Sequence, residues 1–129
     1  KALFLFDLDD FKGINDTYGH AAGDTTLQVF GRILKNVFRK DDIVFRLGGD
    51  EFGAFVQGNG TDFIKNICER IFEALDAQKD LPFQIRASIG IGFAETAEYT
   101  YMDYYHIADK ALYSAKNSGK NIWHLDSFS

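Results

Sequence analysis

The chain has 129 residues, a length typical of one domain, and carries a net charge of −5. Apolar residues make up 46% of it and charged residues 26%, which excludes an intrinsically disordered chain. The 14 lysines and arginines form no basic block, so we expect no nucleic-acid partner, because such a partner requires a cationic face. A small anionic ligand remains compatible with this charge if metal ions supply the positive charge.

Cysteine usage and the lengths of the apolar runs indicate a cytoplasmic location. The single cysteine, Cys68, cannot form an internal disulfide, and we expect it to pack in the core. No apolar run is long enough to span a bilayer and no signal peptide opens the chain, so we expect no direct membrane contact by this domain, although the parent protein could be membrane-anchored. Because the chain begins at Lys1, directly on a predicted strand, we expect it to be a piece of a longer protein.

An apolar run near the start of the chain ends in a cluster of acids. Residues 2–6 predict a strand buried on both faces, and the sequence Asp-Leu-Asp-Asp follows at residues 7–10. A carboxylate at such a strand end is costly to desolvate unless it is paired or binds a metal. Asp7 and Asp9 would share a face if the strand extended that far, and their oxygens would suit Mg²⁺. The alternative is an acidic strand end at the surface, and these residues alone do not decide between the two.

Two helical segments follow the acids. Residues 11–20 predict a short helical turn closed by glycine, whose first amides would face the end of the first strand. Lys12 in this turn would add a positive charge for a phosphate, or is an ordinary surface lysine. From a predicted N-cap at Asp24, apolar residues at helical spacing predict a helix that runs to Phe38.

The stretch Arg46–Phe52, Arg-Leu-Gly-Gly-Asp-Glu-Phe, lies between two extended apolar runs and predicts a β-hairpin. Its adjacent glycines suit a tight turn because glycine adopts positive φ without strain. Asp50 and Glu51 would lie at the mouth of the turn, and one site could use both only where the turn distorts the alternation of the strand. Taken alone, such a stretch is more often a solvated acidic surface turn than a functional site.

The second half of the chain predicts two further helices and two further strands. We expect a helix capped by Asp62, a strand within Leu81–Phe93, a loop at Tyr99–Tyr105 folded onto the core, a helix from Ile107 that ends at a glycine C-cap near Asn117, and a final strand at Asn121–Leu125. This order predicts an α+β sandwich in which helices cover a five-stranded, mostly antiparallel sheet. In such a fold the first strand and the hairpin can be neighbours, which would bring Asp7 beside Asp50.

Six motifs, in the same order, resemble those of the GGDEF-domain diguanylate cyclases over essentially the whole chain. They are Asp7–Lys12, Ile14–Asp16, Gly19–Asp24, Arg46–Phe52, Ser88–Gly90 and Ala108–Lys116. Several motifs in order are far more specific than the hairpin alone. The resemblance implies a palm-like fold, as in nucleotidyl cyclases and polymerases, and an enzyme of bacterial signal transduction. Such an enzyme condenses two GTP molecules into cyclic di-GMP and releases pyrophosphate, acting as a homodimer.

The resemblance also implies the metal ligands and the role of Glu51. Asp7, the backbone carbonyl of Leu8 and Asp50 would bind two Mg²⁺ ions, with Mn²⁺ as an alternative. Glu51 would either help to deprotonate the ribose hydroxyl or help to hold a metal. Independently of the resemblance, carboxylates at a strand end and a hairpin suit a two-metal site, which stabilises the attacking and leaving oxygens of an in-line displacement.

Residues that contact GTP follow from the same resemblance. Asn15 and Asp24 would hydrogen-bond guanine, with the aspartate accepting from the N–H groups of the base. The phosphates would be held by Lys12, the backbone around Phe11, Lys116 and Lys120.

Arg39 and Asp42, an Arg-x-x-Asp motif upstream of the hairpin, resemble the inhibitory site at which the product cyclic di-GMP binds. Arg70 falls where a further arginine contributes to that site. Arginine forks suit phosphates and guanine edges. The alternative is a helix end that carries mixed charges.

Two departures from the family pattern bear on activity. Lys120 stands where many members have arginine, which keeps the charge but loses the bidentate fork. The helical lead-in with Asp-x-Leu-Thr and Asn-Arg motifs is absent, so we expect residues 1–129 to be a GGDEF domain without its lead-in, from a parent chain with sensor or phosphodiesterase domains. The alternative function is a regulatory module that binds GTP or cyclic di-GMP without turnover. Degenerate hairpin residues would favour that alternative, and this hairpin has none.

Overall fold

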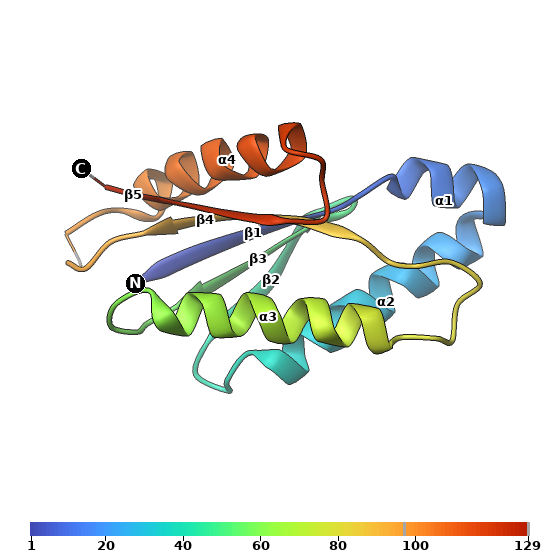
Figure 1. Cartoon of the computed structure of the whole chain (residues 1–129), viewed down its shortest axis with the longest axis horizontal. Coiled ribbons are helices and arrows are strands. Elements are labelled where there is room, and N and C mark those ends of the chain that lie inside the picture. The colour runs from blue at the N-terminus through green and yellow to red at the C-terminus, as the bar shows by residue number, and fades with distance from the viewer. Residues whose placement is uncertain (97, 129) are drawn as a thin grey trace.

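The computed structural model describes residues 1–96 and 98–128, in which a five-stranded sheet lies between two layers of helices (Figure 1). In chain order the elements are β1 (Ala2–Leu8), α1 (Phe11–Tyr18), α2 (His20–Val37), β2 (Ile43–Gly48), β3 (Glu51–Val56), α3 (Asp62–Ala77), β4 (Ala87–Phe93), α4 (Tyr101–Asn117) and β5 (Trp123–Ser127). The strand order is β2-β3-β1-β4-β5, and every neighbouring pair is antiparallel except β4 and β5. The predicted α+β architecture and the mostly antiparallel sheet are confirmed.

Strand β1 lies at the centre of the sheet and is buried on both faces, as its unbroken apolar run predicted. Phe4 and Phe6 point to the face covered by α2 and α3, where Phe6 packs edge-on against Phe30. Leu3 and Leu5 point to the opposite face, which α4 covers (Figure 1). The end of β1 therefore delivers its first polar side chain to the edge of a core that is closed on both sides.

The helices present apolar stripes to the sheet. Cys68 lies on the buried side of α3, where burial raises the pKa of its thiol, so it packs as a small apolar residue as predicted. Within the part of the chain that the structure describes, no helix is long and apolar enough to cross a membrane.

Two predicted helix starts are wrong. Helix α2 begins at His20 rather than at Asp24, because Gly19, at φ 94°, ends α1 and lets the chain turn directly into the next helix. Asp24 is thus an exposed residue within α2. The N-cap of α3 is Thr61, and Asp62 is the first helical residue.

Three boundaries in the second half of the chain also differ from the predictions. The stretch predicted as an aromatic loop is largely helical, because Thr100 and Asp103 form a capping box that starts α4 at Tyr101. The strand within residues 81–93 occupies only its last part, since Pro82 and its neighbours form no ladder. The final strand begins two residues later than predicted. The burial of Tyr104 does confirm that part of the aromatic stretch folds onto the core.

Candidate active site

The hairpin of β2 and β3 forms as predicted and lies beside β1. Gly48 pairs with Glu51, so Gly49 and Asp50 form the connection between the strands. Gly48 and Gly49 both adopt positive φ, 137° and 51° respectively. Arg46 donates from Nε and Nη2 to the carbonyl oxygen of Gly49 at 3.1 and 2.6 Å, which fixes the tip. The pairing shifts between Arg46 and Gly48, and this irregularity places Asp50 in the turn while Glu51 starts the strand.

Three acids, one on β1 and two in the hairpin, lie near one another at this end of the sheet. Asp7 on β1 lies directly opposite Glu51 on β3, and the amide of Leu8 donates to the carbonyl oxygen of Asp50 at 3.2 Å. Burial, and then the nearby charge of Asp7, raise the pKa of the Asp50 carboxyl. The fold thus brings Asp7 and Asp50 together, as expected from the order of elements.

A lysine provides the positive charge beside these acids. Lys116 on α4 contacts the carboxylate of Asp7, which is only 8% exposed. Burial alone would lower the pKa of Lys116, but its contact with Asp7 and the charges of Glu51 and Asp50 outweigh that effect and raise it. The positive charge of Lys116 thus partly offsets the negative charge of the three acids at this end of the sheet.

The oxygen atoms at this site suit a divalent cation whose coordination shell is completed by a substrate. Within residues 1–96 and 98–128, no three His, Cys, Asp or Glu side chains form a preassembled metal cluster. Two carboxylates and a backbone carbonyl at Leu8 make a partial oxygen set. Mg²⁺ is typically bound in this way, through one or two carboxylates together with water and substrate phosphates.

A shallow depression of about 250 Å³ opens beside the acids. It is lined by residues of the β1 end, the α1 start and the hairpin together with two lysines, namely Asp7, Leu8, Asp9, Asp10, Phe11, Lys12, Asp50, Lys116 and Lys120. All the residues predicted to contact phosphates therefore border the same space as the predicted metal ligands. Glu51 is not among the lining residues; it pairs with Asp7, so its side chain lies on the same face of the sheet as that of Asp7, the face that α4 covers.

The two residues predicted to bind guanine lie on α1 and α2. The amide oxygen of Asn15 packs so closely against Gly23 that no Cβ would fit there. Asp24 follows Gly23 and its side chain is exposed. Helices α1 and α2 therefore pack closely at Gly23, where the side chain of Asn15 lies.

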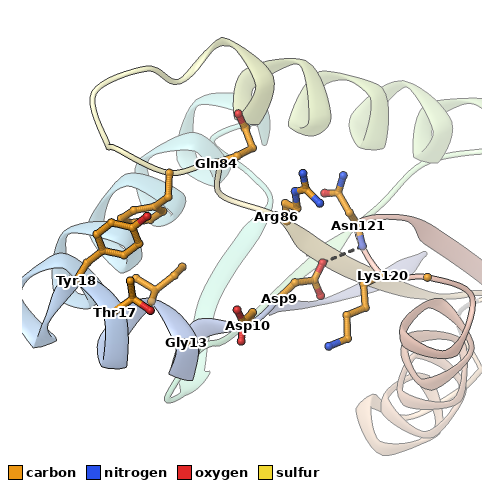
Figure 2. A pocket seen from close by; sticks show the side chains of 12 residues that line it. Asp9, Asp10, Gly13, Thr17, Tyr18, Gln84, Arg86, Lys120 and Asn121 are labelled. Atoms are coloured by element: carbon orange, nitrogen blue, oxygen red, sulfur yellow. Dashed lines mark hydrogen bonds between the residues drawn. The ribbon is translucent and has the colours of Figure 1, made fainter.

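Asp9 does not join Asp7 on one face, because β1 ends at Leu8. Its carboxylate accepts a hydrogen bond from Ser88 Oγ at 2.6 Å. It also accepts one from the backbone N–H of Asn121 at 2.8 Å (Figure 2). The sequence-based reasoning missed Ser88 and Asn121 as partners of Asp9. The one local signal of this contact in the sequence is Ser88 itself, a small hydroxyl residue within an otherwise apolar buried strand.

The residues of the predicted product site also lie together. Arg39, Asp42 and Arg70 line one cavity of about 320 Å³ between the end of α2 and α3. The backbone N–H of Arg39 donates to Asp42 at 2.8 Å, and its Nη2 donates to the carbonyl oxygen of Gln57 at 3.1 Å.

Comparison with known proteins identifies the family of this chain. The family model described as diguanylate cyclase, GGDEF domain, matches residues 1–122. Diguanylate cyclase DgcS of Shewanella oneidensis is 42% identical over 125 residues, which cover 96% of this chain and 42% of that relative. The chain belongs to the GGDEF family of diguanylate cyclases, and it spans less than half the length of this curated relative.

Solved structures show the same fold. The crystal structure of the GGDEF domain of YfiN, also called TpbB, from Pseudomonas aeruginosa has a TM-score of 0.88 and 33% identity, covering 99% of this chain and 83% of that chain. A structure described as a novel interaction mode between a microbial GGDEF domain and cyclic di-GMP has a TM-score of 0.83 and 28% identity, covering 97% of this chain and 78% of that one.

Proposed function

We propose that this chain is the catalytic domain of a diguanylate cyclase, which condenses two GTP molecules into cyclic di-GMP with release of pyrophosphate. The observation that carries the proposal is the proximity of Asp7, at the end of β1, to Asp50, in the turn of the hairpin, beside a depression bordered by three lysines. Each protomer of a homodimer would hold one GTP, so that the two nucleotides face each other.

Metal binding, phosphate binding and proton transfer would be carried out by different residues of the site. Asp7, the Leu8 carbonyl and Asp50 would hold Mg²⁺ or Mn²⁺, two ions per site, which when bound would supply charge stabilisation for in-line displacement at phosphorus. Lys116 would exchange Asp7 for a phosphate oxygen, since the metal then neutralises Asp7. Glu51, which lies on the face of the sheet covered by α4, would take the proton of the attacking ribose hydroxyl or help to hold a metal.

Recognition of the nucleotide would come from α1, α2 and the loop after α4. Lys12, the backbone at Phe11 and Lys120 would join Lys116 at the phosphates. Asn15 and Asp24 would bind guanine, because a carboxylate accepts from N–H groups that adenine does not offer in that arrangement.

The parent protein would place this domain under control of other segments. Since the chain covers 42% of DgcS, we propose a longer cytoplasmic or membrane-anchored protein, with the helical lead-in and sensor or phosphodiesterase domains outside residues 1–129. The reaction itself would occur on the cytoplasmic side, where GTP is available.

The direct assay incubates the protein with GTP and Mg²⁺ and separates the products by chromatography. It uses both residues 1–129 and a longer chain that includes the preceding residues of the parent protein. We expect the longer chain to form cyclic di-GMP and pyrophosphate. Binding of GTP without product by both chains would instead support a regulatory module that does not turn over.

We also propose that cyclic di-GMP binds the cavity formed by Arg39, Asp42 and Arg70, and inhibits the enzyme. Each charge-assisted contact is worth about 1.5–3 kcal/mol, so Arg39→Ala combined with Asp42→Ala should weaken cyclic di-GMP binding roughly tenfold or more. Isothermal titration calorimetry measures this affinity, with exposed Arg32→Ala on α2 as the matched control. Equal affinity in the double variant and the wild type would refute the site.

A further inference from the structure

The loop that joins α4 to β5 has an unusual backbone. Gly119, Lys120 and Asn121 follow one another at φ 110°, 61° and 48°, all in the region that favours glycine. Two of the three are not glycine, so the loop needs contacts that hold it in this conformation.

The carboxylate of Asp9 supplies the long-range contact. Oδ2 accepts from the N–H of Asn121 at 2.8 Å, and Oδ1 accepts from the fully buried hydroxyl of Ser88 at 2.6 Å. The backbone N–H of Asp9 also donates to the carbonyl oxygen of Arg86 at 2.8 Å. One side chain thus ties the end of β1, the start of β4 and the loop after α4 together.

Lys120 is the residue whose position this tie determines. Its own N–H donates to the carbonyl oxygen of Ala115 at 3.2 Å, so the loop is held on one side by the end of α4 and on the other by Asp9. Lys120 lines both the 250 Å³ depression and a neighbouring cavity of about 540 Å³ (Figure 2). A lysine has a long flexible stem, so the point at which its backbone is fixed limits where its ammonium can reach.

We propose that Asp9 is a positioning residue, which places Lys120 at the phosphates of the nucleotide by holding the backbone of Asn121. The inference rests on the proposed function for the identity of the nucleotide. Asp9 acts through hydrogen bonds rather than through its charge. Asparagine at this position can accept from the Asn121 N–H and donate to Ser88 Oγ, whereas alanine can do neither.

The test is a double-mutant cycle of Asp9 with Lys120, with binding of a non-cleavable GTP analogue in Mg²⁺ as the readout. Asp9→Ala and Lys120→Ala should each weaken binding of the analogue roughly tenfold, whereas Asp9→Asn should weaken it by no more than about twofold. When Lys120 is already alanine, adding Asp9→Ala should weaken binding by less than about a further twofold. Exposed Asp76→Asn on α3 is the matched control. Losses that multiply in the double variant, or an Asp9→Asn loss equal to that of Asp9→Ala, would overturn the proposal. If Asp9→Ala fails to fold, Ser88→Ala replaces it in the same cycle. We expect Ser88→Ala to weaken binding of the analogue by less than Asp9→Ala would, and to have no effect in the Lys120→Ala background.

Two further readouts separate this inference from the proposed function. Amide hydrogen exchange at Asn121 needs no nucleotide, and it should accelerate roughly tenfold or more in Asp9→Ala but not in Asp9→Asn or Asp76→Asn. Inorganic tripolyphosphate probes the lysines without guanine. One outcome is that the protein binds tripolyphosphate, with the losses expected for the Asp9 and Lys120 variants, but does not bind the GTP analogue. That outcome would refute the proposed function and support the role of Asp9. Unchanged exchange at Asn121, or binding of neither probe, would refute that role.

Discussion

Asp50→Asn is expected to abolish cyclic di-GMP formation and, at the same time, to raise the melting temperature of the metal-free protein. The first effect follows from loss of a proposed metal ligand, for which we expect a decrease of roughly a thousandfold or more. The second follows from the raised pKa of Asp50, which means that its ionised form is disfavoured by burial and by Asp7. Asparagine keeps the shape of the side chain and removes this unfavourable charge.

The gain in stability from Asp50→Asn should depend on pH, and the direction of that dependence can be measured. A carboxyl whose pKa is higher in the folded than in the unfolded state lowers stability as pH rises from the ordinary toward the raised value, and the loss is complete above it. The gain from Asp50→Asn should therefore be larger at pH 7 than near pH 3, where the wild-type carboxyl is largely protonated in both states. Thermal unfolding without metal, with Asp76→Asn as the control, measures this. Retained turnover in Asp50→Asn, or a gain that is equal at both pH values, would contradict the account.

Gly90→Ala should destabilise the protein by about 3 kcal/mol or more, because β4 lies against α4 at Gly90 with no space for a side chain. A Cβ there would collide with the backbone of Ala108 and Leu112, including Leu112 Cα at 2.6 Å, and backbone atoms cannot rotate away. The change would also displace α4, which carries Lys116.

The matched control for this substitution is Gly31→Ala in α2. The nearest atom to a Cβ at Gly31 is Phe52 Cε2 at 3.7 Å, an ordinary contact. Alanine in a helix interior is expected to stabilise by up to about 1 kcal/mol relative to glycine. Chemical denaturation of both variants provides the comparison, and similar stabilities for the two would show that the packing of α4 on β4 is not as close as described.

Much of the fold was predictable because its strongest signals are local. The apolar run of β1 and the paired glycines of the hairpin specify strand burial and turn geometry within a few residues. The helix starts were less predictable. Asp24 is a good N-cap residue in isolation, but Gly19 and the packing of Asn15 against Gly23 bring the helix start forward. Packing between segments overrode the local preference there.

The candidate site was predictable where acids follow a buried strand, since a desolvated carboxylate requires a partner. It was not predictable where the partners are distant in sequence. The hydrogen bonds of Asp9 reach Ser88 and Asn121, 79 and 112 residues away, and only the pairing of β1 with β4 reveals them. Spacing alone had placed Asp9 together with Asp7, on the condition that the strand extended past Leu8.

The central claim is that Asp7 and Asp50 together hold the metal that serves the GTP phosphates. A crystal structure with Mn²⁺ and a non-cleavable GTP analogue tests it most directly, since anomalous scattering locates the metal. The account predicts Mn²⁺ between the carboxylates of Asp7 and Asp50, with Lys116 moved from Asp7 to a phosphate oxygen. Bound nucleotide with no Mn²⁺ at Asp7 and Asp50 would contradict it.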